Sequence, residues 1–203
     1  MFGSLPVGQM PIGLDIGTDT VNMIQLQKTG TVVSVKACGR WRVPEAGTPD
    51  PGQYRKLVVK AVREILRRND FSGHRVVSAL SYNDLCIKNV RVPRTGGDLY
   101  AAVYREAKER FNFDMGPDQL KYLVAGEVRS GDDVYDEVVI LAADPKTVSD
   151  HLRLLSDMGL QAEHIDAEPV AMFRVFESVP GEGHVEQAEW SRAHSVGVGP
   201  QGG

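Results

Sequence analysis

A segment near the N-terminus, residues 13–20 (GLDIGTDT), constrains the fold of this chain more than any other feature. An apolar lead precedes it and an alternating run, residues 21–27, follows it, which predicts two strands joined by a tight turn. Successive backbone N–H groups in such a turn point into one concavity that can hold phosphate oxygens. Gly17 has no Cβ, so a ligand can approach the backbone there closely. The alternative is an ordinary β-hairpin that binds nothing.

The acid in this segment stands at a position that suits a metal ion. Asp15 is placed at the end of the first expected strand. A hydrated Mg²⁺ beside a bound phosphate would find this carboxylate within reach, since Mg²⁺ is commonly held by one or two carboxylates together with phosphate oxygens. Other metal chemistry is not indicated, because none of the five histidines has a partner at the spacing of a metal site.

Composition limits the classes of protein to consider. The chain has 203 residues, of which 42% are apolar and 25% charged, which is typical of a globular protein with one or two modest domains. A net charge of −4 argues against nucleic acid or an anionic membrane surface as the partner. We see no membrane-spanning run and no signal peptide. Cys38 and Cys86 are isolated, which predicts a reducing cytoplasmic setting and two free, buried thiols.

Hydrophobic periodicity and turn residues divide the chain into alternating strands and helices. Expected strands cover residues 21–27, 32–42, 75–80, 85–92, 119–128, 136–143 and 160–165, and expected helices cover residues 51–69, 99–111, 145–158 and 168–176. The segment 179–203 is rich in glycine and has no periodicity, so we expect it to be disordered.

Several motifs, taken in their order and spacing, resemble one family. They are the opening GLDIGT at residues 13–18, the strand VVSAL at 76–80, VRVP at 90–93 before a helix, REA at 105–107 followed by FNF at 111–113, and IDAEP at 165–169. Together they resemble the PilM family of type IV pilus assembly proteins, which is related to the cell-division protein FtsA. The resemblance implies an α/β fold of the actin-like ATPase (ribonuclease-H-like) class. It places the actin-like subdomain at residues 1–80 and 144–178 and a small inserted α/β subdomain at 81–143.

The resemblance also implies site residues and partners. ATP with Mg²⁺ would be bound, with Asp15 holding the metal through water and with the N–H groups of Gly17, Thr18 and Asp19 facing the phosphates. Glu168 would orient the attacking water, although a carboxylate that opens a helix beside a proline explains it equally well. The implied partner is the cytoplasmic tail of a PilN-like inner-membrane protein, bound in a groove beside the inserted subdomain. The chain would then be cytoplasmic and recruited to the inner membrane by that partner, without inserting into it.

Two departures from the family pattern bear on ATP, and the charge of Asp19 adds to the first. Many relatives carry a lysine where this chain has Asn22, and Asp19 adds a negative charge beside the expected phosphates. No second phosphate loop or adenosine-binding glycine pair follows Phe176, so the chain is expected to represent the first half of the fold only. We therefore expect binding of ATP and Mg²⁺ to be weak or absent. With one half missing, the helix at 168–176 would also leave an apolar strip that favours self-association.

Three functions are compatible with these features. The first is a PilM-like, nucleotide-linked scaffold of pilus assembly. The second is a truncated fragment that binds a peptide without nucleotide and has no enzymatic activity. The third is a fragment of a sugar or metabolite kinase, which would share the opening DIGT at residues 15–18 but here lacks the substrate acid and the second lobe.

Overall fold

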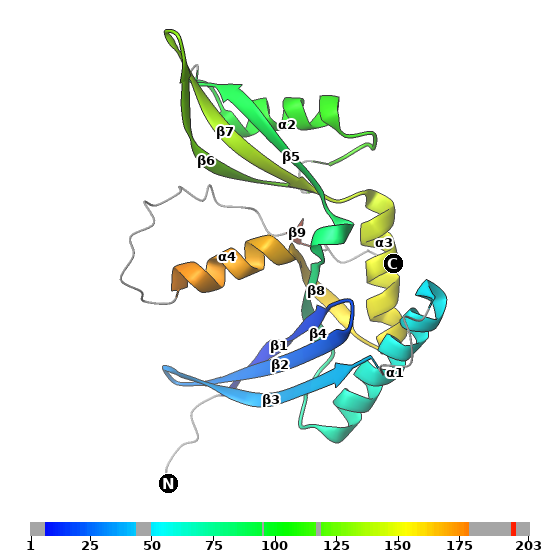
Figure 1. The fold of residues 1–203 in the computed structure, drawn as a ribbon. Coiled ribbons are helices and arrows are strands. Elements are labelled where there is room, and N and C mark those ends of the chain that lie inside the picture. Colours follow the sequence, from blue (N-terminus) through cyan, green and yellow to red (C-terminus); the bar gives the residue numbers. More distant parts are fainter. Residues whose placement is uncertain (1–6, 44–49, 95, 117–118, 179–195, 198–203) are drawn as a thin grey trace, which may run out of the picture. The chain divides into compact units, whose positions relative to one another are not determined.

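The computed structural model of this protein describes residues 7–43, 50–94, 96–116, 119–178 and 196–197. Most of the segment expected to be disordered, 179–203, lies outside these residues, as does most of the loop after residue 43. The chain divides into two compact units (Figure 1). Unit 1 consists of residues 1–79, 150–166 and 197–203, and unit 2 consists of residues 80–149 and 167–196.

Unit 1 is built on a mixed sheet with the strand order β3-β2-β1-β4-β8-β9. An antiparallel meander of β1 (Val7–Ile16), β2 (Thr20–Thr29) and β3 (Val32–Arg42) forms one side of the sheet. The sheet continues through β4 (Arg75–Leu80), which runs parallel to β1, and then β8 (Gln161–Ala167) and the two-residue β9 (Val196–Gly197). The first expected strand pair and its turn are thus the start of this meander.

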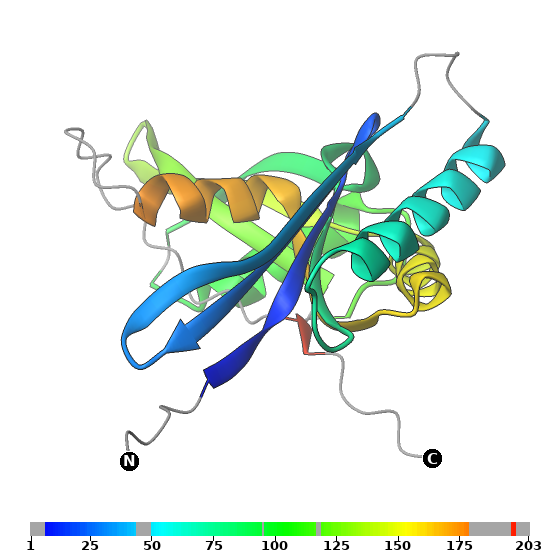
Figure 2. The same cartoon turned by 90° about the horizontal axis from the view of Figure 1, so that it is seen from below.

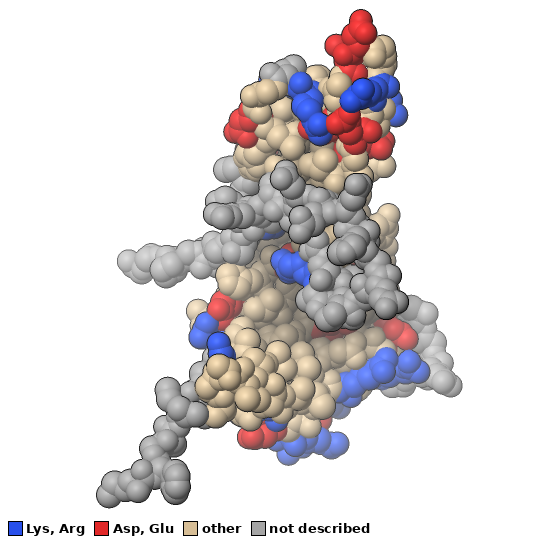
Figure 3. Space-filling view, turned by 90° about the vertical axis from the view of Figure 1, so that its left-hand side faces the viewer, with Lys and Arg blue, Asp and Glu red and all other residues tan. Residues whose placement is uncertain are grey.

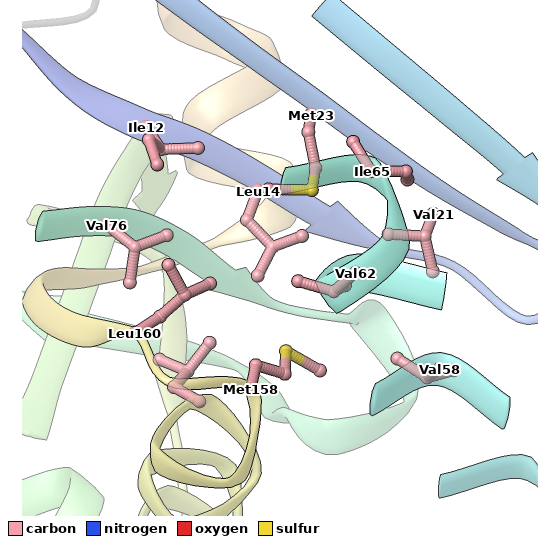
Figure 4. Packing of buried hydrophobic residues seen from close by; sticks show 11 residues of the cluster. Ile12, Leu14, Val21, Met23, Val58, Val62, Ile65, Val76, Met158 and Leu160 are labelled. Atoms are coloured by element: carbon pink, nitrogen blue, oxygen red, sulfur yellow. The ribbon is translucent and has the colours of Figure 1, made fainter. Parts of the chain in front are cut away.

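Helix α1 (Pro51–Arg68) packs on one side of the meander, as Figure 2 shows. It begins at Asp50, whose side chain accepts hydrogen bonds from the N–H groups of Gly52 and Gln53. Its apolar face meets Leu14, Val21 and Met23 in a buried core that includes the end of α3 (Pro145–Met158) (Figure 4). These helices are amphipathic, so their packing on the sheet follows from the removal of apolar surface from water.

The close approach of α1 to β3 depends on one glycine. A Cβ at Gly39 would lie only 2.4 Å from Cγ2 of Ile65, a buried residue of α1. Real Cβ atoms essentially never come so close to another heavy atom. Gly39 therefore lets the helix lie against the strand without a steric clash.

Unit 2 contains an antiparallel sheet with the strand order β5-β7-β6. Its strands are β5 (Cys86–Pro93), β6 (Leu120–Ser130) and β7 (Asp133–Ala142), and a short 3₁₀ helix, η1 (Tyr82–Asp84), precedes them. Helix α2 (Leu99–Arg110) covers one face of this sheet and starts at Asp98, whose carboxylate accepts from the N–H of Tyr100 (Figure 1). Phe111 is buried in this core and stacks on Phe113.

The helices and strands expected from sequence are all present. Their ends differ by at most three residues, the largest difference being at β7, which starts at residue 133 rather than 136. Helix α3 is followed by Gly159, which has a φ of 83°, in the left-handed region that favours glycine. Among the described residues, no helix combines the length and apolar character needed to cross a membrane.

Two expectations about burial hold only in part. Cys38 is exposed, because its side chain lies on the face of β3 that α1 does not cover, while Cys86 is partly buried. On α4 (Glu168–Ser178), Val170 is buried against Leu141 and Ala167 of the same unit rather than exposed in an apolar strip. Met172 and Val175 are exposed, whereas the side chain of Phe176 lies outside the described part of the structure.

Candidate functional site: the turn between β1 and β2

The turn between β1 and β2 brings four of the five predicted site residues together. It is closed by the N–H of Gly17, which donates to the carbonyl of Thr20 over 2.8 Å. The carbonyl of Asp19 in turn accepts from the N–H of Val43, at 2.8 Å, so the end of β3 holds the tip of the turn. Thr18 and Asp19 are exposed at this tip. The backbone of the turn is thereby fixed by contacts from both neighbouring strands.

The structure changes the role expected for Gly17. Its N–H is committed to the turn and does not face a ligand, because the hairpin closes through this group. Its φ is not positive, so the left-handed region does not require glycine here. Space does favour glycine, since a Cβ would lie 3.3 Å from Oγ1 of Thr20 and 3.4 Å from its carbonyl oxygen. Gly17 thus shapes the turn, where we had expected it to contact phosphate.

Two neighbouring N–H groups remain available at the tip. In the part of the chain that the structure describes, the N–H groups of Thr18 and Asp19 have no hydrogen-bond partner. Consecutive backbone N–H groups in a turn form a concavity with positive partial charge, which attracts an anion. This pair is the portion of the turn that can bind phosphate oxygens.

Asp15 is exposed at the end of β1 and faces Asn22 of β2 in the strand register. Nδ2 of Asn22 donates to the Asp15 carboxylate over 2.9 Å, which fixes the orientation of the acid. The donor set fits a magnesium ion held by one carboxylate and by water, since Mg²⁺ retains several waters and is bound through few protein oxygens. Among the described residues, no group of three or more His, Cys, Asp or Glu side chains is placed to hold a metal on its own.

The sequence did not identify Tyr54, whose side chain contacts the backbone of the turn. This residue lies in the first part of α1, and its hydroxyl donates to the carbonyl of Gly17. Burial raises the pKa of Tyr54, and the negative charges of Asp19 and Asp15 raise it further. The only sequence signal was the helix start at Pro51, which did not show that Tyr54 reaches a turn 37 positions away. The pKa of Tyr54 therefore depends first on burial and then on the charge at the turn.

Glu168, the fifth predicted site residue, belongs to unit 2, whereas the turn belongs to unit 1. It is the first residue of α4, and its carboxylate accepts from the N–H of Tyr82 in η1 over 3.1 Å. A carboxylate at the start of a helix is also stabilised by the helix dipole. The contacts within unit 2 are thus those of a residue that joins α4 to η1.

Comparison with known proteins identifies the family to which the turn and α4 belong. The family model of the type IV pilus assembly protein PilM matches residues 13–185, which includes the turn and α4. This chain belongs to the PilM family. No curated protein matches it.

Two solved structures are similar to the chain. One, described as "PilM-PilN type IV pilus biogenesis complex", has a TM-score of 0.57 and 22% identity over 82% of this chain and 50% of that chain. The other, the cytoplasmic domain of EpsL of the Vibrio cholerae type II secretion system, has a TM-score of 0.42 and 15% identity over 79% of this chain and 58% of that chain. The fold is thus the expected α/β fold of the actin-like ATPase class. This PilM family member spans about half the length of the solved PilM chain that it matches.

Proposed function

We propose that this protein is a nucleotide-linked scaffold of type IV pilus assembly that binds the cytoplasmic tail of a PilN-like inner-membrane protein. The observation that carries the proposal is the family match, which covers both the turn and the whole of the small sheet in unit 2. The solved structure with the higher TM-score is described as a complex of PilM with PilN, which supports a partner of that kind. In this role the protein is cytoplasmic and reaches the inner membrane through its partner.

The turn supports the nucleotide part of the proposal. The N–H groups of Thr18 and Asp19 would donate to phosphate oxygens, and Asp15, oriented by Asn22, would hold Mg²⁺ through water. Bound Mg²⁺ would supply positive charge that the phosphates need and that Asn22 does not provide. Gly17 and Tyr54 would keep the turn in shape.

Glu168 would have a further role only if the protein hydrolyses ATP. Its carboxylate would then orient the attacking water, the task that a positioned acid or amide performs in phosphoryl transfer. To do so it would have to exchange its hydrogen bond to the N–H of Tyr82 for one to water. The alternative, a scaffold that binds its partner without nucleotide, leaves Glu168 in its contact with η1.

The test measures binding of a fluorescent peptide with the sequence of the cytoplasmic tail of the PilN-like protein from the same genome. We expect the intact chain to raise the anisotropy of this peptide but not that of a scrambled peptide. A variant lacking residues 85–143 should lose binding, because it lacks the small sheet of unit 2. No binding by the intact, folded chain would overturn the proposed function.

Nucleotide dependence distinguishes the proposed scaffold from the alternative one. The same titration is repeated with ATP and Mg²⁺, using the wild-type chain and Asp15→Ala. A change in tail affinity that Asp15→Ala abolishes supports the nucleotide-linked scaffold. Equal affinity in all four conditions supports the scaffold that works without nucleotide.

A further inference from the structure

Strand β3 forms one edge of the sheet in unit 1 and exposes an unusual number of apolar side chains. Val32, Val33 and Val35 are 65%, 52% and 56% exposed. Edge strands of soluble proteins are normally protected by charges, prolines or a covering element, because their free backbone groups can pair with another strand. The first charge along β3 is Lys36, and its ammonium group is held by Asp70 at 3.4 Å. The segment 32–35 therefore lacks the usual protection.

The register identifies the backbone groups that are free at this edge. Gly30 and Thr31 form the two-residue turn between β2 and β3, and Gly30 has a φ of 61°. The first strand pair of such a hairpin, Thr29 with Val32, is hydrogen-bonded, and hydrogen-bonded and non-hydrogen-bonded pairs then alternate. Val33 and Val35 are therefore in non-hydrogen-bonded pairs, and their N–H and C=O groups point away from β2. In the described part of the chain no other strand pairs with this side of β3.

The side chains of Val33 and Val35 lie on the face of the sheet opposite to α1. In the register, Val35 is paired with Leu26, and Cys38 with Ile24, so these residues share that face. Ile24 is 44% exposed. Figure 3 shows uncharged side chains gathered over the end of the β2–β3 hairpin. Exposed apolar patches of this kind mark interaction sites.

We propose that two copies of this protein pair through β3, edge to edge and antiparallel, about a two-fold axis that passes beside Ser34. In this arrangement Val33 of each copy lies opposite Val35 of the other, and the free N–H and C=O groups of these residues form hydrogen bonds between the copies. The four valines then form one apolar cluster on a single face of the joined sheet, next to Ile24 and Leu26 of each copy.

The sequence of β3 favours a second copy over an unrelated strand. Val33 and Val35 are placed symmetrically about Ser34, so the segment is complementary to itself, as an isologous interface requires. The same register places Lys36 opposite Val32 of the other copy and keeps the two lysines apart, which avoids a like-charge pair. The contact area is small, so the dimer should exchange rapidly with the monomer.

The first test is sedimentation over a range of protein concentrations. We expect the weight-average mass to rise with concentration. Val33→Glu combined with Val35→Glu should abolish this rise, because carboxylates of the two copies would then lie opposite each other. Val33→Pro should also abolish it, since proline removes an outward N–H that the monomer does not use. The matched control is Met172→Glu combined with Val175→Glu, two equally exposed apolar residues of α4. The control should still dimerise.

The second test locates the axis with a disulfide. Opposed residues in a non-hydrogen-bonded antiparallel pair have Cα atoms about 4.5 Å apart, within the range for a disulfide. In a chain with Cys38→Ser and Cys86→Ser, Ser34→Cys should form a covalent dimer on mild oxidation, whereas Lys28→Cys on β2 should not. A monomer at every concentration, a dimer that survives the β3 substitutions, or no Ser34→Cys dimer would overturn the proposal. None of these outcomes bears on binding of the membrane-protein tail.

Discussion

At the scale of the residue, the buried amide of Gln25 stands out. Gln25 is 1% exposed and lies on the face of β2 that contributes to the core of unit 1. Its Nε2 donates to the carbonyls of Met10 and Ser72 over 2.9 and 2.8 Å, and its Oε1 accepts from the N–H of Ser72 over 2.9 Å. Met10 lies where β1 bulges and the ladder to β2 is interrupted. One side chain thus replaces backbone pairing that the bulge removes.

Substitution of Gln25 by leucine should destabilise the protein strongly. It would leave three backbone groups without their partner, and each unsatisfied buried group typically costs about 1–3 kcal/mol, so we expect the free energy of unfolding to fall by at least about 3 kcal/mol. Urea denaturation followed by circular dichroism measures this. Gln27→Leu is the matched control, because Gln27 is more exposed and makes one longer hydrogen bond, 3.3 Å, to Ser34. Equal losses in the two variants would contradict this role of Gln25.

At the scale of the element, the packing of α1 on β3 leaves no room for an added side-chain atom at the contact. A side chain at Gly39 would meet Ile65 of the helix at 2.4 Å, so Gly39→Ala should force the helix and strand apart. Overpacking of this kind costs about 1–3 kcal/mol of the free energy of unfolding. Combining it with Ile65→Ala, which removes the opposing Cγ2, should produce a loss smaller than the sum of the two single losses. Thermal unfolding of the four proteins measures this coupling, and strict additivity would rule out the steric explanation.

At the scale of the whole molecule, each unit has a core of its own, while the predicted phosphate site is confined to unit 1. The described turn offers two free N–H groups and one oriented carboxylate. Asp19 adds a negative charge at the same place. The turn thus gives an ATP molecule only a few favourable contacts, and its two carboxylates repel the phosphates unless Mg²⁺ is present.

We therefore predict that this chain alone binds ATP with Mg²⁺ more weakly than about 1 mM, which corresponds to less than about 4 kcal/mol. Isothermal titration calorimetry tests the affinity, with Asp15→Asn as the variant that removes the metal-holding charge. The difference between the ultraviolet titrations of the wild-type chain and of Tyr54→Phe provides a local readout. Bound Mg²⁺ would oppose the charges that raise the pKa of Tyr54 and so lower that pKa. Micromolar binding would contradict the prediction and would indicate that a second chain completes the site.

The sequence by itself determined the elements and the position of the turn that forms the candidate site. Alternation in β2, the helical spacing of apolar residues in α1 and the turn at residues 17–20 are local patterns, because side-chain period and turn chemistry are set by near neighbours. The family and its fold followed from the order of such local motifs. Asp15 at the end of β1 was likewise predictable, since strand ends are marked in the sequence.

The tertiary structure alone decided which groups of those elements are free or occupied. It assigned the N–H of Gly17 to the turn, brought Tyr54 beneath it, placed Gln25 between Met10 and Ser72, and left the edge of β3 exposed. These outcomes depend on contacts between residues far apart in the chain, such as the 47 positions between Gln25 and Ser72. Local periodicity cannot encode such contacts, because they arise only when separate elements pack against one another.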